Sequence, residues 1–281
     1  IDGVIQKAKN GKFVFERFSP INERIKIVAI DQWGNRSKEK IVNIKIATDT
    51  KITKKRLDKL NPNNKTYNNI TKDKVAIVIG IEKYDRTPNA TYANLDAKYF
   101  YEYARLSFGI PSENIKLLID KDANYIDTLG VLEKWLPGKI TKNRTELIIF
   151  FAGHGLASSD GEELYLLPQN SDPDLLERTA LSRSELFNTI LEFKPKRVTM
   201  FFDTCYSGTS RDEESLLASA RPLRLVTNIE NNIPENFTIF SASKLDQISS
   251  GLKQASHGIF SYYLMKGLEG FADLNKDKKI T

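Results

Sequence analysis

The chain has 281 residues and a mass of 32.0 kDa, with 40% hydrophobic and 28% charged residues, as is usual for soluble globular proteins. No apolar run approaches the roughly 20 residues of a membrane-spanning helix. A single cysteine, Cys205, excludes an internal disulfide framework and a zinc site built from several thiolates. Because His154 and His257 are the only histidines, a multi-histidine metal centre is not expected either.

The net charge of +6 is unevenly distributed along the chain. Residues 1–72 carry 17 Lys and Arg against 7 Asp and Glu, a net charge of +10, whereas residues 73–281 carry 25 against 29, a net charge of −4. A mildly acidic main domain does not favour phosphate contacts, so we expect no nucleic-acid partner. The sequence begins at Ile1 without a signal-peptide pattern, and we interpret it as part of a longer chain.

Residues 1–46 carry a β pattern, with strands expected at 13–15, 25–30 and 41–46 and turn residues at 31–35. These strands are too few to close a sandwich, which predicts a partial β domain. The stretch INERIKIVAIDQWGNRSKEKIVNIKI resembles the last strands of bacterial immunoglobulin-like modules. Because such modules occur in cell-envelope proteins, the resemblance favours an extracytoplasmic location over a cytoplasmic one, although the sequence leaves localisation unknown.

Residues 47–72 are polar, rich in Asn and Lys and almost free of apolar side chains, which is typical of a linker. The basic cluster Lys54-Lys55-Arg56 leaves contact with acidic lipid or nucleic acid as an alternative, but a solvated linker is favoured.

From residue 73 onward, apolar runs alternate with helical patterns. Buried strands are expected at 75–81, 115–119, 147–152, 198–202 and 237–240, with a short hairpin strand at 164–167. Helices are expected at 91–108, 124–136, 182–193 and 258–269, the third opening on the capping box Ser182-Arg183-Ser184-Glu185. This alternation predicts an α/β fold with a mostly parallel sheet covered by helices on both faces. Ligand sites in such sheets lie beyond the carboxyl ends of the strands.

Two of these strands are followed directly by residues whose side chains can take part in catalysis. The strand at 147–152 leads into Gly153-His154-Gly155, and the strand at 198–202 leads into Asp203-Thr204-Cys205-Tyr206-Ser207-Gly208. A parallel sheet brings both ends to the same edge, where a histidine can take the proton of a cysteine nucleophile. Glycines beside the histidine allow backbone amides to approach a reacting carbonyl. Taken singly, each residue is more often structural, but the pair favours nucleophilic catalysis.

Cys205 follows His154 by 51 residues, close to the spacing of about 50 in caspases. The segments IIFFAGHG and TMFFDTCYSG resemble the caspase and metacaspase superfamily of cysteine peptidases. KVAIVIGIEKYDRTPNATYANLDAKYF and SHGIFSYYLMKGLEG are similar to that family's first strand and helix and to its small-subunit helix. The resemblance covers about residues 73–272 and implies a caspase-like peptidase domain over 73–281, with a two-member Cys–His arrangement.

The same resemblance implies the substrate class. Asp203, two residues before the cysteine, and Asp96, in NLDA, match acidic residues of the metacaspase S1 pocket. Two carboxylates would attract Arg or Lys at P1, with Arg favoured by bidentate pairing, and would repel an acidic side chain. An ordinary position in the first helix for Asp96, and a cap or turn role for Asp203, are the structural alternatives.

In the implied mechanism Cys205 attacks the carbonyl after P1, His154 acts as acid and then as base, and the amides of Gly155 and Cys205 stabilise the oxyanion. The residues alone point to no third catalytic group. His257, at the start of the last helix, is interpreted as a helix-start or surface residue. The alternative function is a catalytically silent caspase-like module that serves as a binding scaffold.

No cofactor is expected for the chemistry, and no metal ligand set is assigned. The resemblance makes calcium a candidate activator, with Asp172, Asp174 and Asp212 as acidic candidates, and DLNKDKKIT places Asp273, Asn275 and Asp277 as in a truncated EF-hand loop. Self-processing is expected in segment 209–236. The preferred bond is Arg224–Leu225, because the bond after Arg221 is followed by Pro222 and should resist cleavage. Partners are protein or peptide substrates. The oligomeric state stays open, with a monomer favoured.

Overall fold

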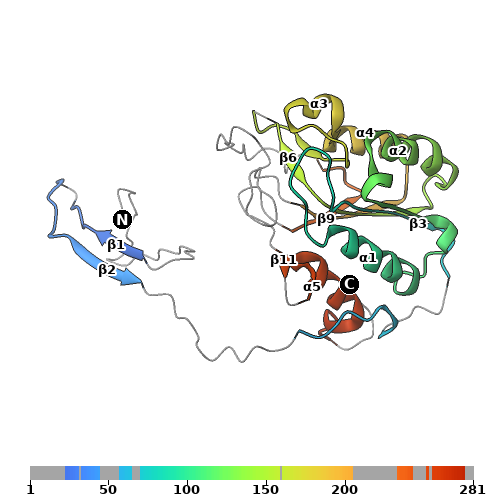
Figure 1. Cartoon of the computed structure of the whole chain (residues 1–281). Helices are drawn as coiled ribbons and strands as arrows, with labels where there is room; N and C mark the ends of the chain where they lie inside the picture. The colour runs from blue at the N-terminus through green and yellow to red at the C-terminus, as the bar shows by residue number, and fades with distance from the viewer. Residues whose placement is uncertain are drawn as a thin grey trace. The chain divides into compact units, whose positions relative to one another are not determined.

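The computed structural model describes residues 23–31, 33–44, 57–64, 70–158, 160–204, 233–242, 251–252 and 255–275. Contacts divide the chain into two compact units, Ile1–Arg56 and Leu57–Thr281 (Figure 1). None of the helices in these ranges is long and apolar enough to cross a membrane.

The first unit contains an antiparallel strand pair, β1 (Glu23–Ile27) and β2 (Lys40–Ile44), with Ile25 opposite Val42. Asp31 organises the connection, because its Oδ1 accepts hydrogen bonds from the N–H groups of Trp33 and Asn35, both at 2.9 Å. Hydrogen bonding by the Asn35 side chain is the main cause that lowers the pKa of Asp31. The strand expected at 13–15 lies outside the described residues.

The second unit is built on a five-stranded sheet in the order β10-β9-β5-β3-β4, in which every neighbouring pair is parallel. Its strands are β3 (Lys74–Gly80), β4 (Ile115–Ile119), β5 (Glu146–Ala152), β9 (Arg197–Asp203) and β10 (Phe237–Ser241). The predicted α/β fold with a mostly parallel sheet is therefore confirmed. There are two smaller antiparallel sheets among the described residues of this unit. One contains β6 (Gly155–Ala157), β7 (Leu164–Leu166) and β8 (Leu181–Ser182). The other pairs β11 (Gly251–Leu252) with β12 (His257–Gly258).

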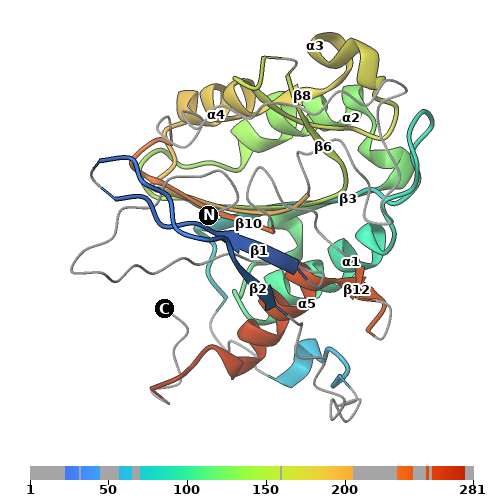
Figure 2. The same ribbon diagram turned by 90° about the vertical axis from the view of Figure 1, so that its left-hand side faces the viewer.

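Helices cover both faces of the central sheet, with α2 and α4 on one face and α1 and α5 on the other (Figures 1 and 2). The α-helices are α1 (Ala93–Leu106), α2 (Tyr125–Gly130), α3 (Leu176–Thr179), α4 (Arg183–Glu192) and α5 (Ile259–Lys266). The helix expected at 124–136 changes to a π-helix, η4 (Val131–Trp135), and a 3-10 turn, η5 (Leu136–Gly138), while α5 continues into η8 (Gly267–Phe271). Single 3-10 turns are η1 (Pro62–Asn64), η2 (Ser112–Asn114), η3 (Asp120–Ala123) and η6 (Pro173–Leu175).

Alternate residues of each central strand enter two different cores. Ile77 and Ile79 of β3 pack with residues of η4 and α4, such as Leu132 and Leu186. Val78 belongs to the opposite core, which also contains residues of α1 and α5. The continuous apolar runs follow from this arrangement, because a strand covered on both faces needs hydrophobic residues at every position.

Gly80 shows how closely α1 approaches the sheet. A Cβ atom at this position would lie 2.3 Å from the Ala97 Cβ and 2.5 Å from the Ala93 carbonyl oxygen. Only glycine therefore allows α1 to pack at this distance.

Residues 57–64, called the strap below, lie within the segment expected as a linker, yet they pack against α5 and η8. Leu60 is buried, and the Lys266 Nζ donates to the Lys59 carbonyl at 3.0 Å. The Asn61 N–H and the Asn64 side-chain amide donate to Glu269 at 2.7 and 3.0 Å. The polar composition of this segment is thus used for hydrogen bonds to the fold.

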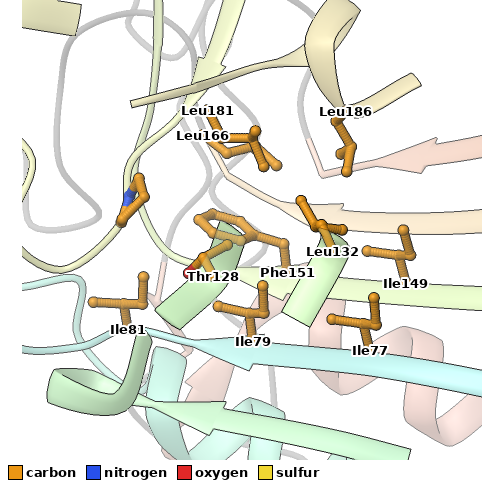
Figure 3. A pocket seen from close by; sticks show the side chains of 11 residues that line it. Ile77, Ile79, Ile81, Thr128, Leu132, Ile149, Phe151, Leu166, Leu181 and Leu186 are labelled. Atoms are coloured by element: carbon orange, nitrogen blue, oxygen red, sulfur yellow. The ribbon is translucent and has the colours of Figure 1, made fainter. Parts of the chain in front are cut away.

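An apolar cavity lies between the central sheet and α2, bounded by side chains such as Ile79, Phe151 and Leu132 (Figure 3). Thr128 of α2 also lines it, and this side chain is buried. The Thr128 hydroxyl has no hydrogen-bond partner within the described part of the chain.

Candidate active site

The neighbouring strands β5 and β9 carry the two halves of the predicted dyad to one edge of the sheet. Ala152 lies opposite Asp203, and the Gly153 N–H donates to the Asp203 carbonyl at 3.3 Å. His154 follows Ala152 by two residues, just as Cys205 follows Asp203 by two residues. Cys205 itself lies outside the described residues, which end on this side at the buried Thr204.

His154 is held by the loop between β3 and α1. Its side chain is buried, and its Nε2 lies 2.7 Å from the carbonyl oxygen of Pro88. Because a carbonyl can only accept a hydrogen bond, Nε2 carries the hydrogen and Nδ1 of the neutral ring is the nitrogen able to accept a proton. The structure therefore assigns the tautomer that a general base needs.

Tyr84 of the same loop holds His154 in two further ways. The Tyr84 and His154 rings lie with centroids 4.6 Å apart at 33°. The Tyr84 hydroxyl accepts from the His154 N–H at 2.8 Å and donates to the Leu167 carbonyl at 3.3 Å. It thereby ties the histidine backbone and the segment after β7 to one oxygen.

Asp120 fixes the start of this loop. Its carboxylate accepts from the N–H groups of Glu82 and Lys83, at 2.8 and 3.0 Å, and from the side-chain amide of Asn94 at 2.9 Å. Further along, the Gln169 side-chain amide donates to Asp85 at 2.8 Å. Both ends of the Tyr84 segment are therefore anchored to the fold.

The glycines on either side of His154 have separate geometric roles. A Cβ at Gly153 would lie 2.5 Å from the Tyr84 hydroxyl oxygen, so a side chain there would displace the tyrosine. Gly155 pairs with Leu166, and the Leu167 N–H donates to the His154 carbonyl at 3.1 Å. In this antiparallel pattern Gly155–Leu166 is a pair without ladder hydrogen bonds, so the Gly155 N–H points away from β7.

Asp96 and Asp203, the predicted S1 residues, are both completely buried and meet at the start of α5. The Asp96 carboxylate lies 2.6 Å from the Nδ1 of His257 and accepts from the Gly258 N–H at 3.0 Å. Asp203 accepts from the N–H and the hydroxyl of Ser261, at 3.3 and 2.5 Å. Gly258 is the N-cap of α5 and has no side chain that could accept a hydrogen bond. The two carboxylates instead accept hydrogen bonds at the N-terminus of this helix, its positive end.

His257 differs in part from its sequence interpretation. It does precede α5, as expected, but it is 4% exposed and is not a surface residue. A lone histidine next to glycine carries no sequence signal that its partner is an aspartate 161 residues away.

The calcium candidates do not form a cluster in the described part of the chain, where no group of three or more His, Cys, Asp or Glu is arranged to hold a metal ion. Asp172 caps η6, accepting from the Asp174 N–H at 3.0 Å, and pairs with Arg86 at 3.3 Å. Asp212 and Asp277 lie outside the described residues.

The model of one protein family, described as the caspase domain, matches residues 73–278. The chain belongs to the caspase family. This membership supports a caspase-like cysteine peptidase that acts on protein substrates. No curated protein matches the chain. The immunoglobulin-like resemblance of residues 1–46 is not confirmed by the comparisons and stays a prediction.

Two solved structures are similar to this chain. The crystal structure of protein GSU0716 from Geobacter sulfurreducens is 16% identical, with a TM-score of 0.51 over 70% of this chain and 82% of that one. The structure of pro-sf-caspase-1 is 13% identical, with a TM-score of 0.44 over 78% of this chain and 76% of that one.

Proposed function

We propose that this caspase-family chain is an active endopeptidase that cleaves after Arg or Lys, with Cys205 as nucleophile and His154 as acid and base. The observation that carries the proposal is the register of β5 and β9, in which Ala152 lies opposite Asp203 and each strand leads into its half of the dyad two residues later. A proton acceptor and a thiol at neighbouring strand ends form the arrangement that thiol catalysis requires.

The first half of the reaction forms an acyl-enzyme. The Cys205 sulfur attacks the scissile carbonyl carbon while the thiol proton passes to the Nδ1 of His154, the nitrogen that can accept a proton when Nε2–H binds the Pro88 carbonyl. The carbonyl oxygen becomes an oxyanion. The Gly155 N–H, which is not used by the β6–β7 ladder, and the Cys205 N–H would stabilise it.

The second half releases both products. Collapse of the tetrahedral intermediate breaks the C–N bond, and the His154 imidazolium gives its proton to the leaving amine. Water then attacks the thioester and loses a proton to the same imidazole, after which the new acid departs and the thiol is restored. The Pro88 carbonyl supports this cycle because it holds the ring in one orientation in both protonation states.

The preference for Arg and Lys rests on Asp96 and Asp203. Both carboxylates are buried at the start of α5, close to the strand end that carries the nucleophile. A carboxylate pair favours a guanidinium or ammonium group and disfavours an acidic P1 side chain. Calcium activation and cleavage at Arg224–Leu225 extend the proposal and rest on the family resemblance, since the processing segment lies outside the described residues.

Covalent labelling tests the proposal directly, because Cys205 is the only cysteine. Peptidyl acyloxymethyl ketones with Arg or with Asp at P1 are incubated with the protein, in calcium or in chelator, and intact mass is followed. We expect one adduct of the Arg reagent, located on Cys205 by peptide mapping, and none in Cys205→Ala. His154→Gln should label far more slowly while keeping its fold by circular dichroism.

The same experiment separates the alternatives. Faster labelling by the Asp reagent would support Cys205 and His154 as the catalytic pair, but it would refute the roles of Asp96 and Asp203 in binding P1. No labelling by either reagent under any condition would support the catalytically silent scaffold module instead. A mass loss that maps to Arg224 during activation would support self-processing.

A further inference from the structure

The connection between β1 and β2 exposes apolar side chains at its tip, defined here as residues 30–31 and 33–36. Trp33 is 78% exposed and Ile30 is 53% exposed. Tryptophan is a large apolar residue that is mostly buried in folded proteins. Exposed apolar side chains that gather at one place, and that have polar residues around them, mark an interaction site more often than single ones do.

Hydrogen bonds within the tip hold it in one shape. The Asp31 carboxylate accepts from the N–H groups of Trp33 and Asn35 and from the Asn35 side-chain amide, each at 2.9 Å. The residues on either side are joined as well, because Ile30 and Arg36 form an antiparallel bridge. An ordered turn therefore presents Trp33 to solvent, and a partner that binds the indole does not have to order the backbone first.

Basic residues lie next to this apolar tip. Arg36 is opposite Ile30 in the bridge, so the two side chains project from the same side of the strand pair. Lys38 and Lys40 follow along the chain, and all three basic residues are exposed. The whole unit Ile1–Arg56 carries 14 Lys and Arg against 6 Asp and Glu, a net charge of +8. A partner with negative charge is therefore attracted to this unit.

Two acidic residues, Asp31 and Glu39, lie between the strands, and both interact with groups of the same unit. Asp31 uses both carboxylate oxygens for the hydrogen bonds of the tip. Glu39 lies 3.5 Å from the Lys26 ammonium. Over residues 24–40, five Lys and Arg outnumber these two carboxylates, which gives a net charge of +3. The surroundings of the exposed indole are therefore positive overall.

An exposed indole with cations beside it has the chemistry that binds an anionic lipid bilayer. Tryptophan prefers the boundary between headgroups and acyl chains, and each Lys or Arg near an anionic membrane surface strengthens binding. Apolar insertion and charge attraction are two signals that together give stable peripheral attachment. Nucleic-acid binding also uses cations and aromatic stacking, but an aliphatic side chain such as Ile30 adds to insertion into lipid and not to stacking. The composition of the tip thus favours lipid.

We propose that the tip is a membrane-surface anchor for anionic lipid bilayers. Trp33 and Ile30 insert among the headgroups, and Arg36, Lys38 and Lys40 bind the headgroup charge. This attachment needs no spanning segment. It uses none of the residues assigned to peptide cleavage, so the inference goes beyond the proposed function and does not depend on it.

Trp33 is itself the reporter for the test, because the chain contains only two tryptophans. In the full chain carrying Trp135→Phe, Trp33 is the only tryptophan fluorophore. This protein is titrated with vesicles of phosphatidylcholine alone and with vesicles that also contain phosphatidylglycerol, at low and at high salt. Brominated acyl chains in the vesicles quench an indole that has entered the bilayer. Co-sedimentation of the wild-type protein with the same vesicles measures binding without any substitution.

We expect the anionic vesicles to cause a blue shift of the Trp33 emission and quenching by brominated lipid, with weaker binding at high salt. Binding to phosphatidylcholine alone should be much weaker. Each cation removed should lower partition into anionic vesicles about fivefold, and so roughly 25-fold for the double variant Arg36→Gln, Lys38→Gln. The matched control, Lys121→Gln with Lys142→Gln, removes the same charge from exposed positions of the second unit and should bind like the wild type.

A second pair of variants tests the apolar part of the tip by co-sedimentation. Trp33→Ser should lower binding at least about tenfold, as expected when roughly half of an aromatic side chain leaves water in the bound state. Ile126→Ser is its control, because Ile126 of the second unit is 71% exposed, and it should leave binding unchanged. Circular dichroism checks that all variants are folded.

Several results would overturn the inference. These are equal binding to neutral and anionic vesicles, a Trp33 emission that stays unchanged while the protein sediments with vesicles, and equal losses in the tip variants and their controls. Binding of a single-stranded oligonucleotide without binding to vesicles would identify nucleic acid as the partner and refute lipid. No peptide cleavage is measured in these experiments, so their failure leaves the proposed function intact, and an inactive peptidase leaves this inference intact.

Discussion

The carboxylate of Glu269 is buried and accepts hydrogen bonds from the strap, from α1 and from α5. The Tyr103→Phe substitution tests how much this junction stabilises the fold. Tyr103 of α1 is completely buried, and its hydroxyl donates to Glu269 at 2.6 Å. The same carboxylate accepts from the Asn61 N–H, the Asn64 side chain and the Lys266 ammonium, at 2.7, 3.0 and 2.8 Å. The substitution removes one of these four donors and leaves the ring packing in place.

The size of the effect follows from the charge and burial of the acceptor. A hydrogen bond to a charged group contributes about 1.5–3 kcal/mol, and a buried carboxylate cannot replace the missing donor with water. Three donors remain, so we expect a loss of about 2 kcal/mol in the free energy of unfolding. For a domain of this size that loss lowers Tm by about 4–8 °C.

Urea unfolding followed by circular dichroism, with thermal scans beside it, measures this loss. Tyr101→Phe is the matched control, because Tyr101 lies on the same helix, is half-buried, and has a hydroxyl with no hydrogen-bond partner among the described residues. The control should change the free energy of unfolding by less than about 0.5 kcal/mol. Equal losses in the two variants would refute the idea that the Glu269 junction is a stabilising centre.

Three further predictions concern the catalytic loop, the cavity and the acid stability. Tyr84→Phe should lower kcat at least tenfold with little change in KM, because it frees the His154 backbone but keeps the ring beside the imidazole; steady-state kinetics measure this, and an unchanged kcat would contradict it. Thr128→Val should raise the free energy of unfolding by about 1 kcal/mol, because it removes a buried hydroxyl without a partner in the described structure; urea titration checks it, and a loss of stability would show that the hydroxyl is satisfied. Burial raises the pKa of Glu269, but hydrogen bonds from Lys266, Tyr103 and Asn61 outweigh burial and lower it below 4.5, so its stabilisation is present above that value and lost as the pH falls through the folded-state pKa. Unfolding free energies from pH 7 to pH 3 should therefore fall more steeply in the wild type than in Glu269→Gln, and parallel curves would count against this assignment.

The sheet could be predicted because its signal is local and repeated. After their first residues, Lys74 and Glu146, the strands β3 and β5 carry no polar side chain, since both of their faces are covered. The capping box before α4 was equally readable, and the Ser182 hydroxyl does accept from the Glu185 N–H at 3.0 Å. The meeting of the ends of β5 and β9 at one edge followed from the expected parallel sheet, whereas the strand order and the register of the two strands come from the structure alone.

The partners of the site residues could not be predicted in the same way. The Pro88 group that binds His154 is a backbone carbonyl, which every residue possesses, so no residue type marks it. No sequence pattern marks Tyr84, because its hydroxyl contacts His154 and Leu167, which are distant in the sequence. The strap has the polar composition of a linker, but its amides pair with Glu269, more than 200 residues later.

The central claim is tested most directly by hydrolysis of fluorogenic peptides that differ only in P1, with Arg, Lys or Asp, by the wild-type protein and by Cys205→Ala. Each peptide is assayed with calcium and with chelator. We predict cleavage after Arg and Lys, little after Asp, and none by the variant. Cleavage that persists in Cys205→Ala, or wild-type protein that cleaves none of the peptides in either condition while remaining folded, would contradict the assignment of an Arg/Lys-specific thiol peptidase.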